Sequence, residues 1–163
     1  MIAWNILSDA LFAALAGIGF GAISDPPMRA FRFIAILAAA GHSFRYILMT
    51  FAGVEISLGS LAGALLIGFG GLWLGKIART PMTVLCIPAL LPMIPGKFAY
   101  NMVFSLIMFL QNMESSSQRA LYMDMFFSNM VITGSVVFVL AAGVTVPMLI
   151  FPKRAFSLTR KKR

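Results

Sequence analysis

Hydrophobic residues follow one another in long blocks along this chain, and short polar or proline-containing segments separate the blocks. The first three blocks cover residues 3–23, 30–51 and 56–75. Each is close to the length of about 20 apolar residues that a helix needs to cross a bilayer. They are closed by Ser24–Pro27, by Gly53 and by a basic segment that reaches Pro81, all of which are signals that end helices. They predict three transmembrane helices, of which the second is the least apolar because it contains His42 and Arg45.

Three prolines interrupt the fourth block, which covers residues 82–111 and contains IPALLPMIPGK at residues 87–97. A proline has no N–H and its ring collides with the carbonyl four residues earlier, so Pro88, Pro92 and Pro95 disrupt a straight helix. In lipid an unpaired carbonyl costs several kcal/mol, so the broken segment must be buried in protein or line a wet cavity. The block therefore predicts a transmembrane helix that is broken near residues 92–96 and begins again at about Lys97.

A polar connector at residues 112–119 leads to a fifth apolar block at residues 120–151, which ends at Pro152. The chain is 60% hydrophobic and only 11% charged, too few charges for the surface of a soluble domain of 163 residues. In a membrane the backbone must pair internally, and the blocks show no strand-like alternation. We therefore predict an all-α polytopic membrane protein with about five transmembrane helices, the fourth broken by prolines. Residues 1–152 form the transmembrane domain and 153–163 a basic tail.

The distribution of positive charge predicts the orientation. Five spans with a cytoplasmic C-terminus place Arg29, Arg32, Lys76, Arg79 and the six basic residues of the tail on the cytoplasmic side, ten in all, against Arg119 alone outside. Such an asymmetry is typical of cytoplasmic loops. The N-terminus is then expected to be periplasmic. The net charge of +8 is concentrated beside the membrane, so it indicates a contact with anionic lipid and not with nucleic acid.

Small residues recur every four positions along the first and third blocks. They are Ala13, Gly17 and Gly21, then Gly59 and Gly63, then Gly71 and Gly75. This spacing lets helix backbones approach closely in lipid. Five spans also make a thin bundle for a complete transport pathway, so a partner subunit or a homo-oligomer is expected.

The broken helix is the first candidate site. The second half-helix would present free N–H groups and the positive end of its dipole near the middle of the bilayer, and Lys97 adds a full charge there. Tyr100 and Asn101 lie three and four residues beyond Lys97 and share its face. Together with Pro92, Pro95 and Gly96 they predict a pathway for a carboxylate-bearing substrate. The alternative is a kinked helix whose Lys97 reaches an interface.

Four ionisable residues inside the predicted spans form the second candidate site. His42 and Arg45 lie three apart on one helix face, and Asp9 and Asp124 are the only carboxylates within spans. Arg45 keeps its charge and needs a carboxylate, a carbonyl or an anionic substrate. The four residues fit an ion pair or a proton relay, or a purely structural pair with a hydrogen-bonded histidine. The chain has one histidine and one cysteine, Cys86, so neither a metal site, a cofactor nor an enzyme's catalytic set is expected.

Several motifs resemble one family. GIGFGAI, PPMRAFR, GHSFRYILM and IPALLPMIPGKFAY, found at residues 17–23, 26–32, 41–49 and 87–100, occur in an order similar to the small, YjjB-type subunit of the split threonine/serine exporter family. The resemblance implies a bacterial inner-membrane transport subunit that works with a larger YjjP-type subunit. It also implies that the substrate is succinate, or threonine and serine. By matching motif, the resemblance implies that the family's functional positions correspond to His42, Arg45, Pro92, Pro95, Gly96 and Tyr100. Lys97 departs from the family's pattern.

The sequence thus predicts a subunit of a two-component exporter of small carboxylate-bearing metabolites. The alternative is a membrane scaffold that stabilises a partner transporter without carrying substrate itself.

Overall fold

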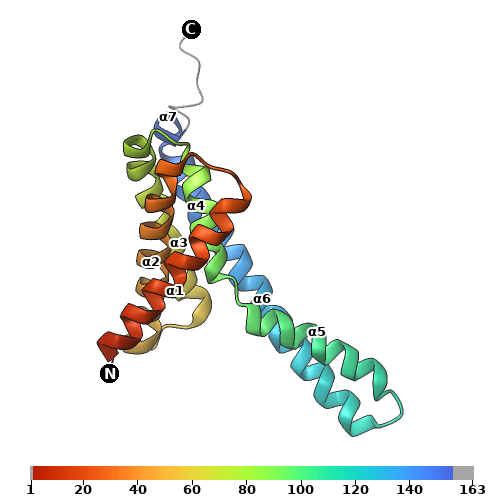
Figure 1. Ribbon diagram of the computed structural model, residues 1–163. Coiled ribbons are helices and arrows are strands. Elements are labelled where there is room, and N and C mark those ends of the chain that lie inside the picture. Colours follow the sequence, from red (N-terminus) through yellow and green to blue (C-terminus); the bar gives the residue numbers. More distant parts are fainter. Residues whose placement is uncertain (1, 156–163) are drawn as a thin grey trace. The chain divides into compact units, whose positions relative to one another are not determined.

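The computed structural model describes residues 2–155, and the elements of that part of the chain are all helical (Figure 1). They are α1 (Ile2–Ile23), α2 (Met28–Phe51), α3 (Ile56–Ala78), α4 (Met82–Leu90), the short 3-10 helix η1 (Leu91–Met93), α5 (Gly96–Gln111), α6 (Ser116–Ile150) and α7 (Pro152–Ala155). Among these residues, four helices are long and apolar enough to cross a membrane, and a bent pair, Met82–Met93 with Gly96–Gln111, makes up to five. The predicted fold class is confirmed.

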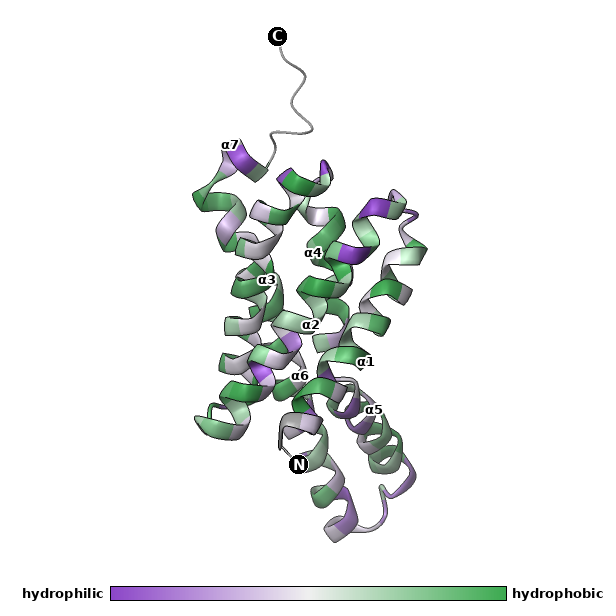
Figure 2. Cartoon of the chain, turned by 60° about the vertical axis from the view of Figure 1, so that its left-hand side comes forward, coloured by the Kyte–Doolittle hydropathy of each residue, from purple (hydrophilic) through white to green (hydrophobic). Residues whose placement is uncertain are grey.

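The chain divides into two compact units, Met1–Met93 with Val139–Arg163, and Ile94–Phe138. In the first unit α2 packs against α1, α3 and α4, and η1 lies against α1, α2 and α4. Its fully buried side chains include Ile34, Ile67, Leu85 and Met93. Figure 2 shows that most residues along these helices are apolar, as expected for helices in a membrane. The second unit contains α5 and the first part of α6.

The third helix is three residues longer than the sequence predicts, because it ends at Ala78 and not at Gly75. Arg79 closes it in the left-handed conformation, with φ 50° and ψ 43°. The N–H of Thr80 donates to the Gly75 carbonyl, so this carbonyl of the last turn has a hydrogen-bond partner beyond the end of the helix. Lys76 lies in this last turn, where a cation interacts favourably with the negative end of the helix dipole.

The prolines of the fourth block have different places in the structure. Pro88 lies inside α4, although the sequence places it among the residues that break the helix. Pro92 lies in η1, and Pro95 directly precedes α5, which begins at Gly96. The regular helix therefore stops at Leu90, tightens for one 3-10 turn and begins again after Pro95. The border between the two compact units falls within this break, between Met93 and Ile94.

The sixth helix begins at Ser116, before the predicted start at residue 120, and contains Pro147 in its last turns. Pro147 is buried beside Gly68 of α3, where the absent side chain leaves room for the proline ring. A short helix, α7, begins at Pro152, one residue before the predicted start of the basic tail at residue 153. Residues 156–163 of that tail lie outside the described part of the chain.

Glycines bring α2 and α3 into backbone contact. Gly41 on α2 and Gly63 on α3 are both buried. A methyl group on Gly63 would lie 2.8 Å from the Gly41 carbonyl oxygen and 2.6 Å from Cε of Met93. The small-residue stripe of the third block thus sets the distance between two helices and the position of Met93.

We expect Gly63→Ala to lower the stability of the purified chain, because the Gly41 carbonyl belongs to the backbone and moves only with its helix. The cost is about 1–3 kcal/mol, typical of an overpacked core. Thermal unfolding in detergent measures it. Gly19→Ala is the matched control, since a methyl group there meets nothing within 4 Å. Equal unfolding temperatures for the two variants would contradict the close approach.

Candidate functional site

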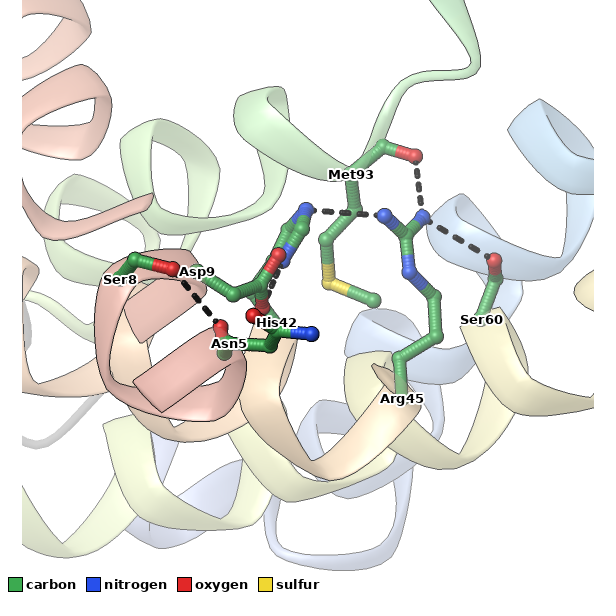
Figure 3. Close-up of polar contacts among 7 residues, drawn as sticks. All are labelled: Asn5, Ser8, Asp9, His42, Arg45, Ser60 and Met93. Atoms are coloured by element: carbon green, nitrogen blue, oxygen red, sulfur yellow. Dashed lines mark hydrogen bonds and ion pairs between the residues drawn. The ribbon is translucent and has the colours of Figure 1, made fainter. Parts of the chain in front are cut away.

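A chain of polar contacts links three of the four ionisable residues that the sequence singles out (Figure 3). Asp9 projects from α1, and its Oδ2 lies 2.7 Å from Nδ1 of His42 on α2. The other ring nitrogen of His42, Nε2, lies 2.8 Å from Nη2 of Arg45, one turn further along the same helix. The imidazole ring therefore stands between a carboxylate and a guanidinium.

The contacts determine the protonation state of His42 in this arrangement. A guanidinium has only donor hydrogens, so Nε2 must accept from Arg45 and carries no proton. The remaining ring hydrogen is then on Nδ1, which donates to the carboxylate of Asp9. His42 is neutral in this geometry, and with Asp9 negative and Arg45 positive the three groups sum to no net charge.

Arg45 also binds the end of the interrupted helix. Its Nη1 donates to the backbone carbonyl of Met93 over 2.8 Å and makes a longer contact, 3.5 Å, with the hydroxyl of Ser60 on α3. In a continuous helix that carbonyl would accept from the N–H of residue 97. Here the N–H of Gly96 donates to the carbonyl of Ile94, and a separate helix, α5, begins at Gly96. The guanidinium replaces the missing donor and places a positive charge at the negative end of α4 and η1.

The cluster is partly screened from solvent. The side chains of His42 and Asp9 keep 18% and 21% of their exposure, and Ser60 and Met93 are fully buried. Gly59 of α3 packs beside the aliphatic part of Arg45, since a methyl group on it would lie 3.2 Å from Cγ of Met49 and 3.4 Å from Cγ of Arg45. A hydrogen bond to a charged group is stronger in such surroundings than in water.

The residues of the predicted pathway lie at the break and beyond it. Pro92 is half-buried in η1, and Pro95 is buried directly before α5. Gly96 and Lys97 are exposed in the first turn of α5. No side chain of Ile94–Phe138, the unit to which Lys97 belongs, pairs with its ammonium group.

Tyr100 and Asn101 follow on α5 but differ in their surroundings. Tyr100 is 69% exposed and stacks on Phe104, with ring centroids 6.2 Å apart. Asn101 is half-buried, and its backbone carbonyl accepts from the hydroxyl of Ser105. Asp124 is exposed on α6 within the second unit and is not part of the Asp9–His42–Arg45 cluster.

Two members of the cluster were missed by sequence reasoning. Ser60 lies between Gly59 and Gly63, so its place in the small-residue stripe was the only available signal. The Met93 carbonyl is a backbone group, and the prolines direct attention to the carbonyls four residues before each of them. In the described residues no group of three His, Cys, Asp or Glu side chains could hold a metal ion.

Comparison with known proteins gives one family. A family model described as "Threonine/Serine exporter, ThrE" matches residues 9–150, which include Asp9, His42, Arg45 and the whole break. No solved structure matches the chain.

We expect Asp9→Ala to destabilise the isolated chain by about 1–3 kcal/mol, because Nδ1–H of His42 loses a charged acceptor and Arg45 loses its compensating charge. Thermal unfolding of the purified protein measures the loss. The matched control is Asp124→Ala, which removes the exposed carboxylate outside the cluster. A smaller loss for Asp9→Ala than for Asp124→Ala would show that the cluster contributes no stability.

Proposed function

The chain belongs to the threonine/serine exporter family, and from this premise we propose that it is the membrane subunit of a two-component exporter. Its substrates are small carboxylate-bearing metabolites, either threonine and serine or a dicarboxylate of the succinate type. It works with a larger, YjjP-type partner subunit in the bacterial inner membrane, and it binds substrate without chemical conversion.

The observation that carries the proposal is the interrupted helix, together with the way its end is held. Irregular backbone at membrane depth is tolerated only where it is buried within the protein or lines a water-filled cavity. Transporters bind their substrates at such breaks. The N–H groups of Lys97 and Phe98 have no carbonyl of the preceding turn as partner, because α5 begins at Gly96. These N–H groups and the Lys97 ammonium suit a carboxylate group.

Lys97 also supports a partner subunit. It lies midway along residues 82–111, and its side chain is exposed. A lysine at mid-membrane is expensive unless it faces protein, water or a counter-charge. A partner that covers this part of α5 and leaves room for an anionic substrate meets that requirement.

Basic residues at one end of the first unit support a cytoplasmic C-terminus. Arg29 at the start of α2 donates to the carbonyl of Arg79 over 3.1 Å, and so ties the α1–α2 and α3–α4 connections together. Lys76 and Arg154 line one small pocket at the same end. Figure 2 shows hydrophilic residues at this end, near α7. Cytoplasmic loops carry such an excess of positive charge, so we assign this end to the cytoplasm and the N-terminus to the periplasm.

The scaffold alternative makes a different prediction. A chain that only stabilises a transporting partner would tolerate apolar replacement of Lys97 as long as the complex forms. The exporter hypothesis requires the charge itself.

Efflux from cells lacking their own exporters tests the proposal. The cells express this chain, the candidate larger subunit or both, and are loaded with labelled succinate or with labelled threonine. We expect efflux only when both chains are present, and the preferred label then gives the substrate class. Efflux from the larger subunit alone at the same rate would show that this chain is not needed for transport, and no efflux with both chains in the membrane would contradict the proposal.

In the same assay we expect Lys97→Ala to lower efflux about tenfold or more, because a charged hydrogen bond contributes about 1.5–3 kcal/mol. Arg119→Ala is the matched control, since Arg119 is an exposed cation of the same unit at the polar connector. Both variants must reach the membrane in normal amounts, as measured by immunoblot. Full efflux from Lys97→Ala would remove Lys97 from the substrate pathway.

A further inference from the structure

His42 joins the Asp9 carboxylate to the Arg45 guanidinium, and Arg45 in turn donates to the Met93 carbonyl at the break. We propose that His42 is a proton-binding site, and that a proton on its Nε2 releases Arg45 from the Met93 carbonyl. The proposal rests on the proposed function only in assigning the break to transport. The release itself is a property of the isolated chain.

On the imidazole ring of His42 the proton has one place to bind. Nδ1 already carries a hydrogen that points at Asp9, so an added proton takes the lone pair of Nε2 that now accepts from Arg45. The imidazolium keeps its Nδ1–H bond to Asp9, which becomes an ion pair. At Nε2, however, two donors then face each other and two positive charges lie side by side. The guanidinium must move away. The covalent change is the new N–H bond on Nε2 alone.

Among the described residues, two ionisable side chains contact His42. Asp9 faces it from α1 and Arg45 from α2. The ionisable residue of α3 is Lys76, in the last turn of that helix, and Glu55 precedes its first turn and accepts from Ser57. The ionisable residue of α4 and η1 is Cys86, whose thiol donates to the carbonyl of Ile67. Residues 139–150 of α6 contain no ionisable side chain. Among the described residues Asp9 is the one other base in contact with His42, and its carboxylate already accepts the hydrogen on Nδ1.

Release of Arg45 acts on the backbone at the break. The Met93 carbonyl has no helical donor, so without Arg45 it must find water or move. Met93 is the last residue of its stretch of the first unit, and Ile94 is the first residue of the second. A proton on His42 therefore loosens the backbone at the border between the two units. Histidine suits this role because its ordinary pKa of about 6.5 lies near physiological pH.

Glutamine at position 42 separates the proton from the hydrogen bonds. Its amide N–H can donate to Asp9 and its amide oxygen can accept from Arg45, as the neutral imidazole does. It binds no proton at physiological pH. In His42→Gln, Arg45 should stay bonded to the Met93 carbonyl at every pH. In Arg45→Gln, the backbone at the break should be mobile at every pH. A purely structural role for His42 would not produce this pair of opposite effects.

The single histidine allows a direct test of the tautomer. The full chain, purified without a histidine tag and labelled with nitrogen-15 only at histidine, gives NMR signals from His42 alone. At about pH 8 we expect a protonated Nδ1 and an unprotonated Nε2, and loss of this preference in Arg45→Gln. A protonated Nε2 at that pH would overturn the proposal, because it cannot accept from Arg45.

A spin label beside the carbonyl tests the release. The label is attached through Ile94→Cys in a Cys86→Ala background, and its mobility is compared at about pH 8 and about pH 5.5, one unit below the ordinary histidine pKa. Ile94 is 43% exposed, and Cys86 is buried. We expect the mobile fraction to rise severalfold on acidification, to stay low in His42→Gln and to stay high in Arg45→Gln. The same pH response with His42→Gln, or a label as immobile in Arg45→Gln as in the parent at pH 8, would overturn the proposal.

The two measurements involve no transport, so their failure is distinct from failure of the exporter hypothesis. If both give the expected result and no efflux is found, His42 controls the break of a protein with another function. If efflux is found and the tautomer or the mobility is wrong, the exporter stands and the proton site at His42 is rejected.

Discussion

The hydrogen bond between the Arg45 guanidinium and the Met93 carbonyl is the contact on which the interrupted helix depends. A helix that stops inside a membrane leaves carbonyls without donors, and lipid supplies none. The chain meets this constraint with a residue 48 positions earlier in the sequence, reaching over 2.8 Å from α2. The guanidinium keeps its charge, and Asp9 balances that charge through His42. One side chain thus satisfies the backbone of one helix and links it to two others.

Close backbone contact makes this arrangement possible. Gly41 and Gly63 bring α2 and α3 together, and Gly63 also leaves room for the end of the Met93 side chain. Gly59 lies beside the aliphatic part of Arg45. In lipid, helices gain little from the hydrophobic effect when they associate, so contact of this kind supplies much of the driving force. The glycine stripe and the polar cluster are therefore parts of one structure, because the stripe sets where the cluster can form.

An exporter needs a binding site that can both form and open. The membership of the family and the break agree on a transport role, and carboxylates are common to the substrate classes that we propose. The cluster sums to no net charge, a state that suits a half-buried position and that a single proton changes. Lys97 adds a second positive group on the other side of the break, in the unit that begins at Ile94. The two proposals therefore assign the proton to one segment of the interrupted helix and the anionic substrate to the other.

The sequence by itself determined the membrane class, the helical fold and the approximate position of the break, because apolar block length and proline chemistry are local properties. It also singled out Asp9, His42 and Arg45, since ionisable residues are rare inside apolar blocks. It did not indicate that Pro88 would lie within a regular helix, nor that α3 would continue to Ala78, because those limits depend on hydrogen bonds formed at particular residues. Asp9 and Asp124 were both candidates for Arg45, and only the tertiary structure placed Asp9 at His42 and a backbone carbonyl at Arg45. Such a choice follows from how helices approach one another, which no local pattern of residues specifies.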